Sequence, residues 1–316
     1  MKVAFHSRLL TERGSEGAML DFARMNRAVL GNESILCLPD KPSHAGNPIL
    51  KKWKEEFEII LYRDRNDLGR RLKREGAEVL YMTKPGLWDG FLVPGVKNCI
   101  HAQFLCDEFH GDAYAYLSPW MSRVMTGREE SFVPFFVPRL ESKADLRGRL
   151  GIPRKAKVFG RHGGWDTFNI PFARKTVKRH ANHHPEDHFV FLNTEPIRGT
   201  EKMKNVHYLP ATVDMGEKAE FLATCDAMLH ARCHGETFGL AVAEFAVLGK
   251  PVITFGGSRE RAHLEMLGEA GEVFGDRVSL QAKLENVHIG GQRTTNYMAW
   301  SNPAQVMGIF KEKFLN

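Results

Sequence analysis

Residues 234–252 read HGETFGLAVAEFAVLGKPV, and this stretch is the strongest fold signal in the chain. Its middle part, LAVAEFAVL, is apolar on every side of a helix, yet it carries the carboxylate of Glu244. An isolated carboxylate is costly to bury, so Glu244 needs a partner. Thr237 is a suitable N-cap and Gly249 a suitable stop signal. We therefore expect a buried helix over residues 238–248, followed by a strand.

A second carboxylate, Glu236, lies eight residues before Glu244. Eight helical steps return two side chains to within roughly 80° of each other, so both carboxylates could face one ligand. The helix start at Phe238, Gly239 and Leu240 would offer free N–H groups and the positive end of the helix dipole to a phosphate. Carboxylates beside a phosphate site can accept hydrogen bonds from sugar hydroxyls. The alternative is a buried glutamate paired with Arg or Lys from a neighbouring helix.

Outside this stretch, short apolar strand patterns alternate with helical patterns, which is typical of parallel sheets covered on both faces. The strands are expected at 2–7, 34–39, 58–63, 79–83, 98–104, 113–118, 157–161, 188–193, 206–210, 227–231 and 251–255. The other helices are expected at 17–30, 66–75, 143–150, 171–183, 216–224 and 259–267.

Prolines between residues 134 and 153 interrupt the alternation, so we place a domain boundary near 139. The sequence thus predicts an α/β protein with two Rossmann-like βαβ domains, residues 1–139 and 140–302. Residues 303–316 form a further helical segment that could cross back to the first domain. Ligands are expected at the carboxyl ends of the strands, in a cleft between the two domains.

Composition narrows the class of protein. Hydrophobic residues make up 43% of the 316 residues and charged residues 26%, which excludes a disordered chain. No apolar run approaches the roughly 20 residues of a membrane span, so no stable membrane insertion is expected. Five cysteines without a C-x-x-C pair favour a reducing, cytoplasmic location and give no zinc motif. The formal charge of +6 permits an anionic ligand, from a nucleotide to a nucleic acid.

The run GETFGLAVAEFAVLGKPVITFGG (235–257) resembles the signature of retaining glycosyltransferases of family 4 and their GT-B relatives. The resemblance consists of two glutamates separated by seven residues, an F-G-hydrophobic triplet, a helix of small residues and a G-x-P-V stop. It implies a GT-B fold, with two parallel sheets facing a central cleft. It also implies that Glu244 holds the ribose hydroxyls of a nucleotide sugar and that Glu236 contacts the transferred sugar. The donor diphosphate would then lie at the Phe238, Gly239 and Leu240 turn.

The stretch GRHGGWDTF (160–168) resembles the strand-G-R element of the same family. Arg161 would neutralise diphosphate charge there, and Gly163 would let backbone amides approach the ligand. The family has a lysine a few residues later, where this chain has Asp166 and Thr167. Thr167 is therefore a candidate donor-binding residue, and another cation could replace the lysine. Two candidates for that cation lie downstream: Arg174 and Lys175.

Two candidates lie in the first domain. The stretch RLLTERGSEG (8–17) resembles the first glycine loop of the family, in which Gly14 could face the donor phosphates or the acceptor. His101, near the end of the strand in NCIHAQF (98–104), resembles the histidine at the family's cleft and is a candidate catalytic residue. A histidine on a strand can equally have a structural role. No histidine and cysteine spacing matches a known metal site, so no metal is expected.

The resemblance implies a metal-independent transferase that moves a sugar from a nucleoside-diphosphate sugar to an acceptor hydroxyl, with retention of configuration and no other cofactor. The acceptor could be a glycan or a small molecule. It could also be a modified DNA base, since the stretch RDRNDLGRRLKR (63–74) is strongly basic. A GT-B nucleotide-sugar epimerase or hydrolase, and a catalytically silent sugar-nucleotide-binding module, are the other hypotheses. The sequence does not define the donor base, the donor sugar or the oligomeric state.

Overall fold

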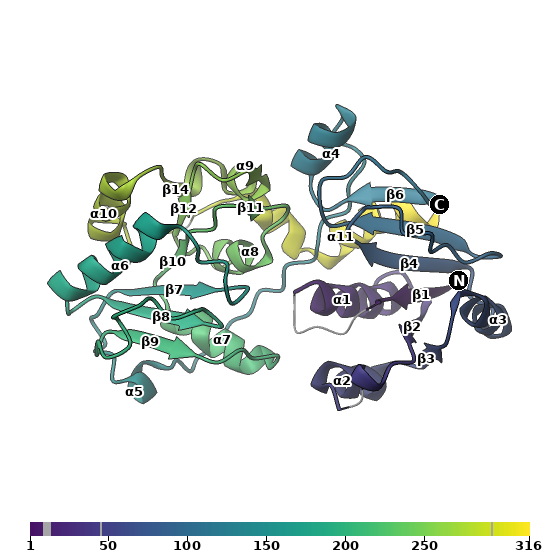
Figure 1. Ribbon diagram of the computed structural model, residues 1–316, viewed down its shortest axis with the longest axis horizontal. Coiled ribbons are helices and arrows are strands. Elements are labelled where there is room, and N and C mark those ends of the chain that lie inside the picture. The colour runs from purple at the N-terminus through teal and green to yellow at the C-terminus, as the bar shows by residue number, and fades with distance from the viewer. Residues whose placement is uncertain (9–13, 45, 292) are drawn as a thin grey trace. The chain divides into compact units, whose positions relative to one another are not determined.

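A computed structural model describes residues 1–8, 14–44, 46–291 and 293–316, and it divides the chain into two compact units (Figure 1). The first unit comprises Met1–Phe136 together with Asn302–Asn316, and the second comprises Val137–Ser301. Each unit is built on a six-stranded parallel sheet. The predicted α/β fold with two Rossmann-like parallel sheets is therefore confirmed. The division between the units falls at residue 137, close to the predicted position near 139.

The first unit has the strand order β3-β2-β1-β4-β5-β6. Its strands are β1 (Lys2–His6), β2 (Glu33–Pro39), β3 (Ile59–Tyr62), β4 (Val79–Lys84), β5 (Lys97–Ala102) and β6 (Ala113–Tyr116). Its helices are α1 (Gly14–Ala28), α2 (Pro48–Glu56), α3 (Arg65–Glu75), α4 (Pro119–Thr126) and α11 (Pro303–Phe310). Sequence patterns missed α2 and α4, which are short and begin with proline after an Asn47 or a Ser118 N-cap.

The second unit has the equivalent order β14-β12-β10-β7-β8-β9. Its main strands are β7 (Val158–His162), β8 (His188–Leu192), β9 (Val206–Leu209), β10 (Ala227–His230), β12 (Val252–Phe255) and β14 (Gly271–Phe274). Its helices are α5 (Arg147–Leu150), α6 (Pro171–His183), α7 (Met215–Thr224), α8 (Leu240–Ala246), α9 (Ala262–Leu267) and α10 (Arg277–Asn286). A separate two-stranded pair joins β11 (Gly235–Glu236) to β13 (Glu260–Arg261).

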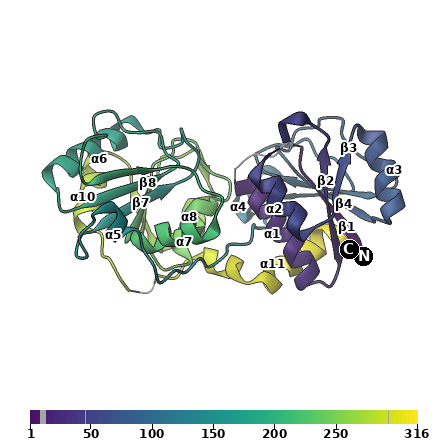
Figure 2. The same ribbon diagram turned by 90° about the horizontal axis from the view of Figure 1, so that it is seen from below.

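Helices cover both faces of the second sheet (Figure 2). On one face, Phe159 belongs to a buried cluster that includes residues of α6 and α10. On the other face, an added Cβ at Gly160 would lie 2.3 Å from Cys225 Sγ and 3.0 Å from the ring of Phe245. Successive residues of β7 thus pack against helices on opposite faces of the sheet. This packing explains why β7 is buried along its whole length and has polar side chains only at its carboxyl end.

The strand order of each sheet creates a topological switch point. In the second unit, the chain runs from β7 outward to β9, returns to β10 and then runs to the other edge. The connections after β7 and β10 therefore diverge, and open α/β sheets bind ligands in the crevice that this divergence leaves at the carboxyl ends of the strands. No helix in the described part of the chain has both the length and the apolar character needed to cross a bilayer.

The end of the chain packs on the first unit. The ring of Phe310 on α11 lies 5.1 Å from that of Phe22 and 5.2 Å from that of Tyr81. The following turn, Lys311–Leu315, places Phe314 against Tyr81 with ring centroids 5.5 Å apart. The predicted helical segment from residue 303 therefore belongs to the core of the first unit.

Replacing Phe310 with Ala should destabilise the first unit by about 3–5 kcal/mol, because Phe310 is fully buried against four other aromatic rings. Lys311→Ala, one residue further along at an exposed position, is the matched control and should have little effect. Guanidinium unfolding followed by circular dichroism measures both. A loss below about 1 kcal/mol for Phe310→Ala would contradict this packing.

Candidate functional site

The candidate site lies at the carboxyl ends of β7 and β10 in the second unit. Arg161 and His162 are the last two residues of β7, and His230 is the last residue of β10. These strands are hydrogen-bonded neighbours in parallel register. Since successive residues on a strand point to opposite faces, Arg161 and His162 serve two different groups of residues. Arg161 faces the loop that follows β7, whereas His162 faces α7 and α8.

Glu236 is held by two cationic or polar side chains. Its Oε1 lies 3.2 Å from His230 Nε2, and its Oε2 accepts a hydrogen bond of 2.8 Å from Arg232 Nη1. His230 Nδ1 in turn lies 2.9 Å from the Thr254 hydroxyl, which fixes the imidazole. Burial raises the pKa of Glu236, but His230 and Arg232 outweigh it and leave the pKa at about 2. Glu236 is therefore ionised at neutral pH.

Gly235 positions Glu236. Its φ is +80°, and an added Cβ would lie 1.9 Å from the carbonyl oxygen of Glu260. Only glycine tolerates both the left-handed conformation and this close approach. The contact pairs β11 with β13, so Glu236 projects from a two-residue strand and not from the helix that follows. The helical angle between Glu236 and Glu244 that the sequence suggested therefore does not apply.

Helix α8 is shorter than predicted. It begins at Leu240 and ends at Ala246, and its N-cap is Gly239 with φ +85°, not Thr237. A left-handed residue cannot lie inside a right-handed helix, so the helix cannot include Phe238. The Tyr297 hydroxyl donates to the Phe238 carbonyl, which keeps that carbonyl outside the helix. The predicted helix over 238–248 was therefore wrong at both ends.

Glu244 has cationic partners within the protein. Lys218 on α7 donates to its Oε1, and His162 Nε2 lies 3.0 Å from its Oε2. Burial raises the pKa of Glu244, but the attraction of Lys218 and His162 outweighs this effect and leaves the pKa at about 2. The structure thus shows the alternative that the sequence left open, a buried glutamate paired with a lysine from a neighbouring helix. The cost of burying Glu244 does not by itself require a sugar ligand, and its contact with ribose remains a prediction.

Arg161 shapes the loop after β7. It is only 4% exposed; Nη1 donates to the Asn193 carbonyl and the Thr194 hydroxyl, and Nη2 donates to the Gly164 carbonyl and the Thr167 hydroxyl. Burial lowers its pKa to about 10, against the opposing charge of Glu236. The predicted donor-binding residues Arg161 and Thr167 are therefore brought together, but they bond to each other and to the loop.

The other predicted donor residues surround this loop and the start of α8. Gly163 has φ +146°, and its carbonyl accepts a hydrogen bond of 2.9 Å from the Asn193 side chain. Phe238 is buried against Tyr297, with ring centroids 5.6 Å apart. Leu240 is the first residue of α8 and is partly exposed. All three lie in the second unit, in the segments that follow β7 and β10.

His101 is a core residue of the first unit. It is completely buried; Nε2 donates to the Val133 carbonyl at 2.8 Å, and Nδ1 accepts from the Tyr81 hydroxyl at 2.6 Å. Burial lowers its pKa to about 4. Neither ring nitrogen is open to a sugar, so His101 has the contacts of a structural histidine and we leave it out of the proposed site. Gly14 is the exposed first residue of α1, and the preceding residues 9–13 of the glycine loop lie outside the described residues.

Sequence reasoning missed four residues of this site. His162, His230 and Arg232 each lie at or just after the end of a predicted strand, so the strand-end rule could have found them. Lys218 gave no such signal, because its contact with Glu244 spans 26 residues of sequence. Lys218 and Arg232 therefore supply the positive charge next to the two carboxylates, whereas the sequence pointed to Arg161, Arg174 and Lys175.

Further histidines and a third carboxylate lie close by. Glu260 lies 3.3 Å from His234, and burial raises the pKa of Glu260. His263 is completely buried, with its ring 4.9 Å from that of His230, and burial lowers its pKa to about 3. Within the described ranges, no group of three or more His, Cys, Asp or Glu side chains is placed to hold a metal ion.

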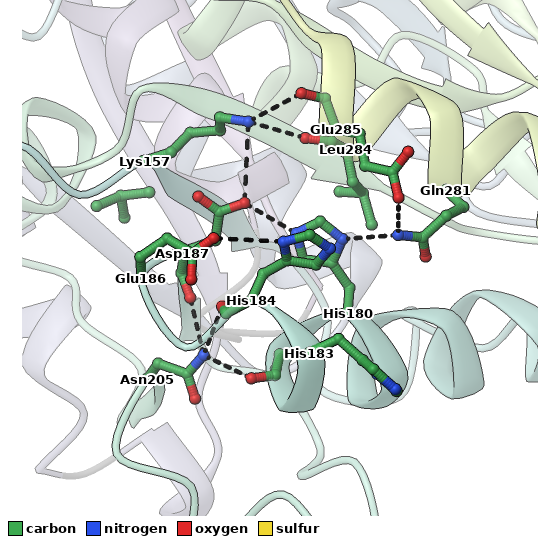
Figure 3. Close-up of polar contacts among 12 residues, drawn as sticks. Lys157, His180, His183, His184, Glu186, Asp187, Asn205, Gln281, Leu284 and Glu285 are labelled. Carbon is green, nitrogen blue, oxygen red and sulfur yellow. Dashed lines mark hydrogen bonds and ion pairs between the residues drawn. The ribbon is translucent and has the colours of Figure 1, made fainter.

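A second polar cluster lies at the opposite, amino-terminal end of the same sheet, just before β7 and β8. Figure 3 shows its polar contacts. His180 on α6 lies between Asp187, at 2.9 Å, and Gln281 on α10, at 3.1 Å. Lys157, just before β7, lies 3.8 Å from Asp187 and donates to two carbonyls at the end of α10. These contacts join α6 and α10 to the starts of β7 and β8, which is a structural role.

Comparison with known proteins identifies the fold. No protein-family model matches the chain, and no curated protein matches its sequence. Among solved structures, the chain is similar to Anabaena Alr3699/HepE in complex with UDP and glucose, with a TM-score of 0.66 and 13% identity over 99% of this chain and 95% of that one. AviGT4, a glycosyltransferase involved in Avilamycin A biosynthesis, gives 0.61 and 15% over 99% and 96%. The S. aureus MnaA-UDP co-structure gives 0.60 and 12% over 98% and 94%. The chain therefore has the two-domain GT-B fold.

Replacing Lys218 with Met should destabilise the protein by about 3 kcal/mol or more at neutral pH, because it leaves the Glu244 carboxylate buried without its cation. The stabilisation from ionised Glu244 is present above its ordinary pKa of 4.5 and is lost as the pH falls toward about 2. The difference between wild type and Lys218→Met should therefore narrow on acidification.

Lys283→Met is the control, since Lys283 forms a more exposed ion pair with Glu272 and should cost less than about 1 kcal/mol. Urea unfolding at neutral and acidic pH measures both variants. Equal losses for the two lysines would show that the buried pair has no special role.

Proposed function

We propose that this chain is a retaining, metal-independent glycosyltransferase that moves a sugar from a nucleoside-diphosphate sugar to an acceptor hydroxyl. The observation that carries the proposal is the ionised carboxylate of Glu236, held by His230 and Arg232 at the switch point of the second unit. Ligands of open α/β sheets bind at such points. The similar HepE structures contain UDP, UDP-glucose, or UDP with glucose, which supports a nucleotide-sugar donor.

In the proposed donor complex, Glu236 accepts hydrogen bonds from hydroxyls of the transferred sugar. The Gly239 and Leu240 turn offers backbone amides to the diphosphate, and Arg161 maintains the loop that contains Gly163 and Thr167. Glu244 binds the ribose hydroxyls, which replace Lys218 or His162 as partners of its oxygens. This exchange keeps the buried carboxylate hydrogen-bonded both with and without donor.

The proposed reaction breaks the bond between the anomeric carbon and the distal phosphate oxygen and forms a bond from that carbon to the acceptor oxygen. The proton of the acceptor hydroxyl passes to the departing phosphate oxygen, so that both events occur on one face of the sugar and configuration is retained. As the bond breaks, positive charge develops on the sugar and negative charge on the diphosphate. The carboxylate of Glu236 stabilises the positive charge on the sugar, and nearby cations stabilise the negative charge on the diphosphate.

The acceptor is proposed to be a glycan or a small molecule. A modified DNA base is less favoured, because the basic helix α3 neutralises part of its own charge. Arg71 lies 3.1 Å and Arg70 3.5 Å from Asp67, and Arg74 lies 3.4 Å from Glu75. Binding of the protein to duplex DNA with an affinity that falls as the salt concentration rises would favour the modified DNA base as acceptor.

A nucleotide-sugar epimerase is the second candidate function. The similarity to the structure of a putative UDP-N-acetylglucosamine 2-epimerase from Listeria monocytogenes supports it, with a TM-score of 0.59 close to the 0.61 of AviGT4. Incubation of a bound UDP-sugar without acceptor separates the two functions. Formation of an epimer would favour the epimerase, release of free sugar a hydrolase, and tight donor binding without turnover on any acceptor a silent binding module.

Replacing Glu236 with Gln should reduce the transfer rate by about 100-fold or more while the fold is retained, because the charge that stabilises the reacting sugar is removed. A thermal-shift screen with UDP-, GDP-, ADP- and CMP-sugars first selects the donor, and product formation with an acceptor panel is then measured. Glu186→Gln, which removes an exposed carboxylate at the amino-terminal end of the same sheet, is the control. Transfer by Glu236→Gln at the wild-type rate would remove Glu236 from the mechanism.

A further inference from the structure

A diphosphate in the proposed donor site needs a cation, and Arg161 is not free to supply one. A guanidinium has five N–H groups, four of them on the two Nη atoms. In Arg161, Nη1 is bonded to Asn193 and Thr194, and Nη2 to Gly164 and Thr167. Binding a phosphate through either Nη would break contacts that hold the loop after β7 in place.

The other candidate cations are also committed or distant from the carboxylates. Arg174 donates to the Glu195 carboxylate at 2.7 Å and to the backbone carbonyls of Phe168 and Pro196. Lys218 is bonded to Glu244. Lys175 is exposed on α6 and has no contact with the site among the residues that the structure describes.

Arg232 differs from these cations in place and in bonding. It lies two residues after the end of β10, at the switch point of the sheet. Its Nη1 donates to Glu236 Oε2 at 2.8 Å, and within the described chain its Nη2 and Nε make no hydrogen bond. The side chain is 27% exposed, whereas Arg161 is 4% exposed. Its charge also acts on Arg161, Glu260 and His263, so it lies among the groups of the site.

We propose, on the basis of the function proposed above, that Arg232 binds the donor diphosphate through Nη2 and Nε while Nη1 remains on Glu236. The planar guanidinium fork matches the geometry of phosphate oxygens, and a charge-assisted pair of this kind is stronger than a neutral hydrogen bond. One side chain then joins the carboxylate that contacts the sugar to the group that leaves it. Arg232 thereby takes the place of the lysine that this chain lacks near Asp166 and Thr167.

Calorimetric titration of the full chain with UDP, GDP and ADP, and with the matching monophosphate, tests the proposal. Arg232→Gln should weaken binding of the preferred diphosphate by about tenfold or more and affect the monophosphate less. Arg232→Lys should fall between Gln and wild type, because an ammonium cannot hold Glu236 and the diphosphate with one planar fork. Arg277→Gln, an exposed arginine on α10, removes the same charge and should leave binding unchanged.

Glu236→Gln separates diphosphate binding from a merely structural role of Arg232. If Arg232 binds the diphosphate, this variant should bind the free nucleoside diphosphate at least as tightly as wild type, since it removes a nearby negative charge. If Arg232 only holds Glu236 in place, the two Gln variants should lose equal affinity, and the inference is overturned. Unchanged affinity in Arg232→Gln also overturns it.

Two further outcomes are distinguishable. If wild type binds none of the three diphosphates, the proposed function itself fails. That failure is distinct from a failure of Arg232 to bind the diphosphate. If Arg232→Gln does not fold, as judged by circular dichroism, Arg232→Lys keeps the charge pair with Glu236 and carries the test: weaker diphosphate binding supports the proposal, and wild-type affinity contradicts it.

Discussion

Two carboxylates, the half-buried Glu236 and the buried Glu244, are each held by a cation from another element and determine the arrangement at the carboxyl edge of the second sheet. Glu236 joins β11 to the segment after β10 through Arg232, and Glu244 joins α8 to α7 through Lys218. Each carboxylate also contacts a histidine at a strand end, His230 or His162. Removing one member would leave an uncompensated charge in the interior, so the ion pairs stabilise the site and fix its geometry together.

The same contacts set what the site can do. Ionised carboxylates can accept hydrogen bonds from sugar hydroxyls only if their protein partners leave lone pairs free or exchange with the ligand. Arg161 is committed to the loop after β7, whereas Arg232 keeps donors available beside Glu236. The residue that most resembled the diphosphate cation in sequence is thus the one that maintains the loop, and its neighbour across the switch point is better placed to bind an anion.

Sequence predicted the fold well where local signals and tertiary packing agree. Helix α6 was predicted at its observed bounds, 171–183, because a proline start and a regular apolar face mark it clearly. Helix α8 was predicted too long, since only tertiary structure sets Gly239 in the left-handed region. Lys218, the lysine partner of Glu244, was beyond prediction for the same reason. Lys218 is close to Glu244 because α7 and α8 pack on one face of the sheet, and no local pattern encodes that distance.

A crystal structure with the tightest-binding nucleoside diphosphate would test the central claim most directly, namely that the switch point of the second unit is the donor site. The account predicts the diphosphate within hydrogen-bond distance of the Arg232 guanidinium and the amides of Gly239 and Leu240, with the ribose hydroxyls on Glu244. A nucleotide bound elsewhere, or Glu244 still hydrogen-bonded to Lys218 and beside His162 with the ribose turned away, would contradict it.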